Sequence, residues 1–111
     1  PTSLSTPKPN QTNRDILGIF YNDTNGDRWI RNDNWLTSTN HCTWYGVFNC
    51  NADDEVTNLN LRNNNVDGTL PKELGLLTRL TSLDLNNNEL SGFIPNELGL
   101  LTGLERLILT D

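Results

Sequence analysis

The side chains that could support the most kinds of chemistry in this chain are those of His41, Cys42 and Cys50. Imidazole and thiolate groups bind zinc, and they act as base and nucleophile in catalysis. A structural zinc site needs four ligands, and the adjacent His41 and Cys42 are poorly spaced to share one ion. Neighbours in sequence also seldom direct both groups at one reacting atom, which disfavours a cysteine–histidine nucleophile. We therefore expect neither a bound metal nor a catalytic cysteine in this segment.

A second cluster, Asp23, Asn25 and Asp27, has the alternate oxygen ligands that begin a calcium-binding loop. The likeness ends where Arg28 replaces the glycine of such loops and where Asn34 replaces their bidentate glutamate. We interpret this segment as a capping turn, with calcium binding as the weaker alternative.

An acidic run at 53–55 is interpreted as a solvated turn. Paired catalytic carboxylates need a cleft that raises the pKa of one of them, and a hairpin-like loop supplies none. The sequence also has no Gly-rich phosphate loop and no kinase motif. We therefore predict a protein that is not an enzyme and that needs no cofactor.

The elements that position these side chains follow a repeat with a period of 24 residues. Units of this length are too small to bury an apolar face alone and must stack on a neighbour, so the period predicts a solenoid. The recurring positions are Val56, Leu59, Leu61, Asn64, Val66, Gly68, Leu70, Pro71, Leu74, Gly75 and Leu77 in the first copy, Leu80, Leu83, Leu85, Asn88, Leu90, Gly92, Ile94, Pro95, Leu98, Gly99 and Leu101 in the second, and Leu104, Leu107 and Leu109 in the third.

Within a unit, the alternation at 59–61 predicts a short strand with both leucines inward. Asn64 falls at the sharp turn that follows, where its amide can bond backbone groups that the turn leaves unpaired. Asn88 falls at the equivalent place in the next unit. Stacked at strand spacing, the two amides would form a ladder that ties each turn to the next.

The pattern LxxLxLxxNxVxGxLPxxLGxLxx resembles the plant-type leucine-rich repeat, with residues 56–79 as a first repeat, 80–103 as a second and 104–111 as an incomplete third. This resemblance implies an α/β fold, a right-handed solenoid with a parallel sheet on its concave side.

Segments 25–29, 34–36 and 42–50 are similar to the N-terminal cap of extracellular leucine-rich-repeat proteins of plants and algae, in which a CxWxGVxC motif is closed by a disulfide. Here the motif has one extra residue before its second cysteine. Since the chain has only two cysteines, we predict a Cys42–Cys50 disulfide. A cap is physically required, because the first repeat would otherwise expose its leucines to water. We assign this cover to Trp29, Trp35 and Trp44.

The cap is expected over residues 12–55, after a linker or extended tail at 1–11 that is rich in Pro, Ser and Thr. It should begin with a helix that ends near Asn22, because a run of turn formers follows. The helix has an apolar face of Ile16, Leu17, Phe20 and Tyr21, an N-cap at Thr12 or Asn13, and Asp15 in its first turn.

Several features predict an extracellular location. Asn10 and Asn22 begin triplets that match the N-glycosylation pattern, which also arises by chance in a chain rich in Asn and Thr. A disulfide favours an oxidising compartment.

The formal charge of −6 disfavours nucleic acids and anionic membranes as partners. No apolar stretch approaches the roughly 18–20 residues of a membrane span, and no signal peptide is recognisable. Because the sequence has no Met, we expect a processed chain or a piece of a longer protein.

The outward strand positions vary between copies, whereas the inward ones barely change. A recognition surface needs this pattern, and drift at exposed positions also leaves it. We predict a non-enzymatic recognition module that binds a protein, peptide or glycan ligand across the concave sheet. The alternatives are a secreted structural or adhesion scaffold, including ice or cell-wall surface binding, and the ectodomain of a receptor kinase. Self-association through the open C-terminal end is also expected. The outward positions are Asn58, Asn60, Arg62, Ser82, Asp84, Asn86, Arg106, Ile108 and Thr110.

Overall fold

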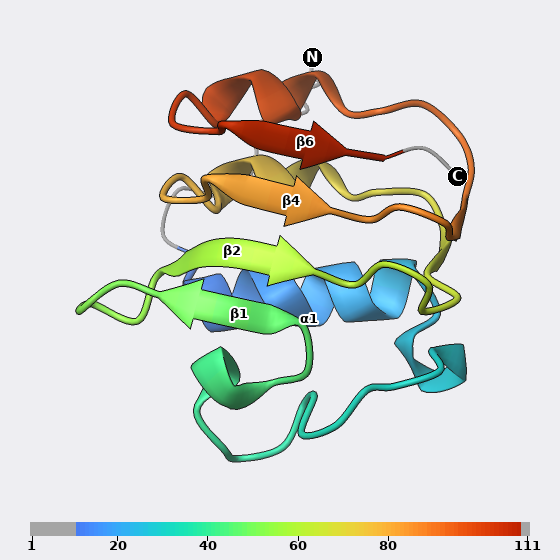
Figure 1. Ribbon diagram of the computed structural model, residues 1–111, viewed down its shortest axis with the longest axis horizontal. Helices are drawn as coiled ribbons and strands as arrows, with labels where there is room; N and C mark the ends of the chain where they lie inside the picture. Colours follow the sequence, from blue (N-terminus) through green and yellow to red (C-terminus); the bar gives the residue numbers. More distant parts are fainter. Residues whose placement is uncertain (1–10, 110–111) are drawn as a thin grey trace.

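The computed structural model describes residues 11–109. A four-stranded sheet forms one side of the molecule, in the order β1-β2-β4-β6 (Figure 1). Strands β2 (Val56–Asn60), β4 (Ser82–Asp84) and β6 (Arg106–Ile108) run parallel, and β1 (Val47–Cys50) pairs antiparallel with β2. Leu59 aligns with Leu83, and Leu83 with Leu107, so each unit of 24 residues adds one turn. The predicted fold, a right-handed solenoid with a parallel sheet, is confirmed.

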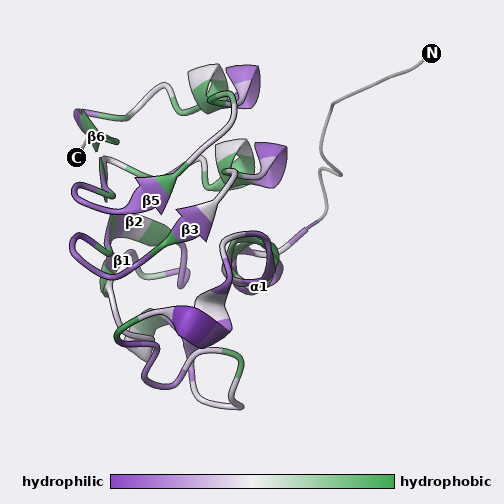
Figure 2. Ribbon diagram, turned by 90° about the vertical axis from the view of Figure 1, so that its right-hand side faces the viewer, coloured by the Kyte–Doolittle hydropathy of each residue, from purple (hydrophilic) through white to green (hydrophobic). Residues whose placement is uncertain are grey.

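The return path of each turn lies on the side opposite to the sheet. Figure 2 shows the short strands β3 (Asp67–Gly68) and β5 (Glu89–Leu90) between that sheet and two stacked 3₁₀ helices. These helices, η3 (Lys72–Leu76) and η4 (Asn96–Leu100), each follow a proline directly, where a missing backbone N–H breaks no helical bond. Leucines from both sides fill the space between the layers and are fully buried in the first unit, as at Leu59, Leu61, Leu74 and Leu77.

The helix α1 (Asn13–Asp23) covers the N-terminal end of the stack, next to η3. Thr12 is its N-cap: the Thr12 hydroxyl accepts the Asp15 N–H at 3.1 Å, and the Asp15 carboxylate accepts the Thr12 N–H at 3.2 Å. The helix ends one residue beyond the expected Asn22. Its apolar face, residues 16, 17, 20 and 21, is buried as predicted.

An aromatic cluster joins α1 to the first repeat. The ring centroids of Trp29 and Trp35 are 4.9 Å apart, and those of Trp35 and Trp44 are 5.0 Å apart. Phe20 and Tyr21 of the helix pack against the first two of these rings. All three tryptophans are buried, so the expected aromatic cover is present.

The predicted Cys42–Cys50 disulfide is confirmed, and it links the 3₁₀ helix η2 (His41–Thr43) to β1 with a Cα–Cα distance of 6.1 Å. The extra residue of the cysteine motif is absorbed within β1, whose pairing with β2 shifts register on both sides of Asn49. Such a bulge adds one unpaired residue to a strand and bends the strand locally, while pairing continues on either side. None of the helices in the described range has the length and apolar character of a membrane span.

Candidate functional site

The outward side chains of β2, β4 and β6, with the side chains two residues beyond the ends of β2 and β4, form a polar surface that we call the sheet face. The parallel register places Ser82 between Asn58 and Arg106, and Asp84 between Asn60 and Ile108. The sheet face consists of Asn58, Asn60, Arg62, Ser82, Asp84, Asn86, Arg106 and Ile108. The ninth predicted position, Thr110, lies outside the described residues, as do residues 1–10 of the tail expected at 1–11, including Asn10.

Asp84 is not the exposed charge that we expected, because it is only 3% exposed. Its Oδ1 accepts the N–H of Asn86 at 3.0 Å, as the Oδ1 of Asn60 accepts the N–H of Arg62 at 3.2 Å one unit earlier. Both side chains therefore turn the chain at the end of a strand. The Arg62 guanidinium also lies 3.8 Å from the second carboxylate oxygen of Asp84 and helps to cover it.

On the sheet face, several side-chain oxygens accept hydrogen bonds from within the protein, whereas most side-chain N–H donors have no partner among residues 11–109. The Oδ1 atoms of Asn58, Asn60 and Asp84 all accept hydrogen bonds from nearby residues. Within residues 11–109, the side-chain NH₂ groups of Asn58, Asn60 and Asn86 donate no hydrogen bond to the protein, and neither does the guanidinium of Arg106. The sheet face carries two guanidinium groups and one carboxylate, so it has a local positive excess in an acidic chain. Such a surface suits a ligand rich in acceptors.

Asn64 and Asn88 lie at the turns after β2 and β4 and are almost fully buried. The Oδ1 of Asn88 accepts the N–H groups of Asn64 and Val66, each at 2.9 Å, and its Nδ2 donates to the carbonyl of Leu61 at 2.9 Å. Asn64 reaches the cap instead, because its amide both donates to and accepts from the backbone of Arg31, at 2.9 and 2.8 Å. Each side-chain amide thus binds the backbone of the part that precedes its own repeat: the cap for Asn64, and the first repeat for Asn88.

The leucine-rich repeat family model matches residues 55–77 and 79–101. An Arabidopsis thaliana protein named Leucine-rich repeat protein 1 is 48% identical over 44 residues, which are 40% of this chain and 20% of that protein. The chain contains plant-type leucine-rich repeats. It spans about a fifth of the length of this curated relative.

Solved structures agree with this assignment and with the plant type of the repeat. A plant ice-binding protein has a TM-score of 0.74 at 22% identity, over 86% of this chain and 31% of its own. The leucine-rich-repeat ectodomain of the Arabidopsis thaliana receptor kinase SOBIR1 has a TM-score of 0.66 at 24% identity, over 88% and 52% of the two chains. The PEPR1-AtPEP1 structure has a TM-score of 0.64 at 29% identity, over 86% and 15%.

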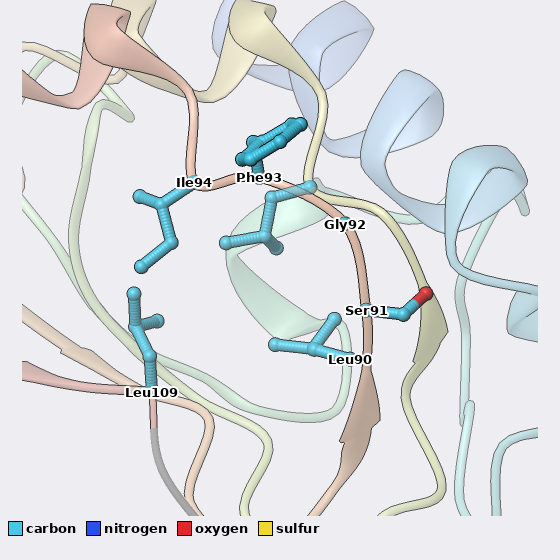
Figure 3. Close-up of a pocket in the computed structure, with 7 residues that line it drawn as sticks. Leu90, Ser91, Gly92, Phe93, Ile94 and Leu109 are labelled. Carbon is cyan, nitrogen blue, oxygen red and sulfur yellow. The ribbon is translucent and has the colours of Figure 1, made fainter.

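The last of the described leucine-rich repeats leaves an apolar hollow of about 180 Å³ at the end of the stack. Figure 3 shows Ile94 and Leu109 pointing toward one another across it, beside Leu90 and Phe93. Ile94 is 58% exposed, whereas Leu70, its equivalent one unit earlier, is 5% exposed. The difference arises because a following unit covers Leu70.

The cysteine and histidine side chains of the cap do come together. Potential ligand atoms of His41, Cys42 and Cys50 all lie within 4.8 Å of one another. Both sulfurs are joined in the disulfide, so neither is the thiolate that zinc binding or nucleophilic attack requires. The Nε2 of His41 lies 2.7 Å from the carbonyl oxygen of Asp54, to which it donates.

The side chains of the calcium-like cluster serve different partners. Asn25 adopts a left-handed backbone at the start of the 3₁₀ turn η1 (Gly26–Arg28), and its amide donates to the carbonyl of Asp67. The carboxylate of Asp27 accepts the hydroxyl proton of Tyr21 at 3.0 Å. Burial, and then the negative charge of Glu73, raise the pKa of the Asp23 carboxyl. This arrangement is the turn that the sequence favours.

The acidic run forms the turn between β1 and β2. The side-chain oxygen of Asn51 accepts the N–H groups of Asp53 and Glu55 at 2.9 and 3.0 Å. Asp53 and Asp54 are exposed, and Glu55 lies 3.5 Å from the guanidinium of Arg79. These carboxylates face solvent and cations rather than one another in a cleft, so they form a solvated turn.

Two side chains of α1 make long-range contacts that sequence reasoning missed: Asn13 binds the first repeat, and Arg14 binds a later part of the cap. The Oδ1 of Asn13 accepts the N–H of Val56 at 2.7 Å, across 43 residues. Arg14 donates to the carbonyls of Thr37 and Thr39, and its guanidinium lies 4.8 Å from the ring centroid of Trp44. No local pattern signals contacts between residues so far apart in the chain.

Proposed function

We propose that this leucine-rich repeat protein is a non-enzymatic, extracellular recognition module that binds a peptide segment bearing carboxylates across the sheet face. The observation that carries the proposal is the contrast between acceptors and donors: Asn60 and Asp84 use their oxygens to turn the chain, whereas the neighbouring side-chain amides and the Arg106 guanidinium have no partner among residues 11–109. Carboxylates accept bidentate bonds from arginine and further bonds from amides.

The matched repeat family and the similar solved structures support a peptide or protein as the partner. Leucine-rich repeat domains are typically protein-interaction modules, and the similar PEPR1-AtPEP1 structure favours a peptide or protein partner. The disulfide and the likeness to receptor ectodomains favour an extracellular location. Arg62 lies two residues beyond the end of β2 and Arg106 begins β6, so an extended segment that crosses the sheet can meet both.

The test is a binding screen with short peptides rich in Asp and Glu, compared with peptides in which Asn and Gln replace them. We expect capture of the acidic set, and about a tenfold or greater loss in the Arg62→Ala, Arg106→Ala double variant. Arg79→Ala is the matched control, because its guanidinium is exposed but lies outside the sheet face. Equal losses in both variants would mean nonspecific attraction. Capture of glycans alone, or of no ligand, would instead favour glycan recognition or a structural scaffold.

A further inference from the structure

The cap has an open hollow of its own, separate from the sheet face. It measures about 480 Å³, within the range of about 300–1,000 Å³ that is typical of ligand pockets. Asp15, Gly18 and Asn22 line it from one stripe of α1, at the spacing of neighbours on a helix surface. Leu36 and Trp44 line it from the rest of the cap.

Asn22 stands at the rim of this hollow and begins the triplet Asn22-Asp23-Thr24. It is exposed, and its side chain makes no hydrogen bond within residues 11–109. We propose that Asn22 carries an N-linked glycan and that the first sugar of this glycan lies in the hollow. This inference rests on the extracellular location proposed above, because N-glycosylation occurs on secreted chains.

The modification needs an oligosaccharide carried on a lipid pyrophosphate as its donor. The Nδ2 of Asn22 forms a bond to C1 of the first sugar, and the bond from C1 to the pyrophosphate oxygen breaks. The lipid pyrophosphate leaves with the electron pair of that bond, and the amide loses one proton. No oxidant or reductant is needed, and the Asn22 side chain becomes a secondary amide.

The structure sets the order of modification and folding. Thr24, the third residue of the triplet, is completely buried, and its hydroxyl donates to the carbonyl of Phe20 at 2.6 Å. A transferase that reads both Asn22 and the hydroxyl of Thr24 has no access to that hydroxyl once α1 is formed. Transfer therefore precedes folding of the cap, after which Asn22 remains on the outer surface and leaves room for the sugar.

Gly18 leaves the space that the sugar would fill. A Cβ built at Gly18, one helical turn before Asn22, would meet only Leu36, at an ordinary 3.7 Å. Leu36 is 51% exposed, and the apolar side of a sugar ring with its N-acetyl methyl group would cover it. Arg14 and Asp15 also line the hollow and offer polar partners for the sugar hydroxyls.

The first experiment tests the site. The Asn10→Gln chain is secreted from a glycosylating eukaryotic host, and its Asn22 peptide is examined by mass spectrometry. We expect a glycan on Asn22, its retention in a further Thr24→Ser variant, which keeps the triplet, and its loss in Asn22→Gln. An unmodified Asn22 in the secreted chain would overturn the proposal. Transfer to Asn22 in chain that was folded beforehand would overturn the order of events.

The second experiment tests where the sugar lies. The glycan is trimmed to one sugar, and the Tm is compared with that of the same chain after complete removal by an amidase, in Gly18→Ala and Gly18→Gln backgrounds. We expect the single sugar to raise the Tm by about 4 °C in Gly18→Ala and not in Gly18→Gln, whose longer side chain fills the hollow. The amidase leaves a carboxylate in place of the Asn22 amide, and residues 18 and 22 are neighbours on α1. Its own effect on the Tm is therefore measured in each background by comparing unglycosylated chains with and without Asn22→Asp. Equal shifts would show that the sugar lies elsewhere.

These outcomes separate this inference from the proposed function. Peptide capture by the sheet face is measured on the same glycosylated and trimmed samples. Capture without a glycan at Asn22 would refute only the glycan. A glycan at Asn22 without any capture would refute only the binding function.

Discussion

Asn88 holds the backbone of the unit before it on two sides, because its Oδ1 accepts the N–H of Asn64 at 2.9 Å while its Nδ2 donates to the carbonyl of Leu61. All of these groups are sealed from water, so no solvent molecule replaces a lost bond. One side chain thus shapes a turn and ties two units together.

Replacing Asn88 with Leu should lower the free energy of unfolding by about 3 kcal/mol or more, since each buried group left unpaired costs about 1–3 kcal/mol. Urea denaturation measures the loss. The control is Asn87→Gly, not Asn87→Leu, because Asn87 has a φ of 60° and a leucine there would add backbone strain. Similar losses in both variants would show that the buried amide contributes little.

Loss of the Cys42–Cys50 bridge should destabilise the cap. The bridge joins residues eight positions apart, and a loop of this size contributes about 2–3 kcal/mol in the chain-entropy model. The Tm should fall by several degrees when a reductant is added. A Cys42→Ser, Cys50→Ser variant should melt at the lower temperature with or without reductant. Recovery of two free thiols from the native protein would contradict the bridge itself.

Asp84 should tolerate Asn but not Ala. Asp84→Ala leaves the N–H of Asn86 without its acceptor in a covered site, at a cost of about 1–3 kcal/mol. Asp84→Asn keeps an oxygen there, as Asn60 does at the equivalent position, and should lie within about 1 kcal/mol of wild type. Thermal melts of the two variants distinguish these outcomes, and equal stability would place the carboxylate in solvent.

Asp23 should make stability fall as pH rises. Its folded pKa lies above the ordinary 3.8, so between the two values the folded state binds more protons than the unfolded state. Asp23→Asn should therefore be more stable than wild type at neutral pH and no more stable below 3.8. The gain will be modest because Asp23 is exposed. Parallel urea titrations at the two pH values test it, and a pH-independent difference would argue against titration of this group.

The 111-residue chain should self-associate through its apolar end. Phe93 is 94% exposed and Ile94 is 58% exposed, and β6 is the edge strand of the sheet within residues 11–109. Sedimentation over a wide concentration range should show association that Ile94→Asp weakens. Ile30→Asp is the matched control, since Ile30 is 71% exposed but belongs to the cap. A chain that stays monomeric at every concentration would contradict this prediction.

Much of the fold could be predicted from the sequence because its determinants are local or periodic. The 24-residue period predicts which leucines face inward and where β2, β4 and β6 align. Two cysteines allow one intramolecular pairing. Turn residues and helical spacing likewise predict the position of α1 to within one residue at its end.

Only the tertiary structure decided which polar side chains are buried and which distant residues they bind. Thr12, not Asn13, caps α1, because the Asn13 side chain binds the distant N–H of Val56. Asp84 has the outward position that the period predicts, yet it is buried by the side chains around it. The hollow beside Asn22 exists because a glycine of α1 meets a loop that follows Trp35. The sequence period predicts whether a side chain on a strand points inward or outward. Its burial and its hydrogen-bond partners depend on residues that only the stacking of the repeats brings together.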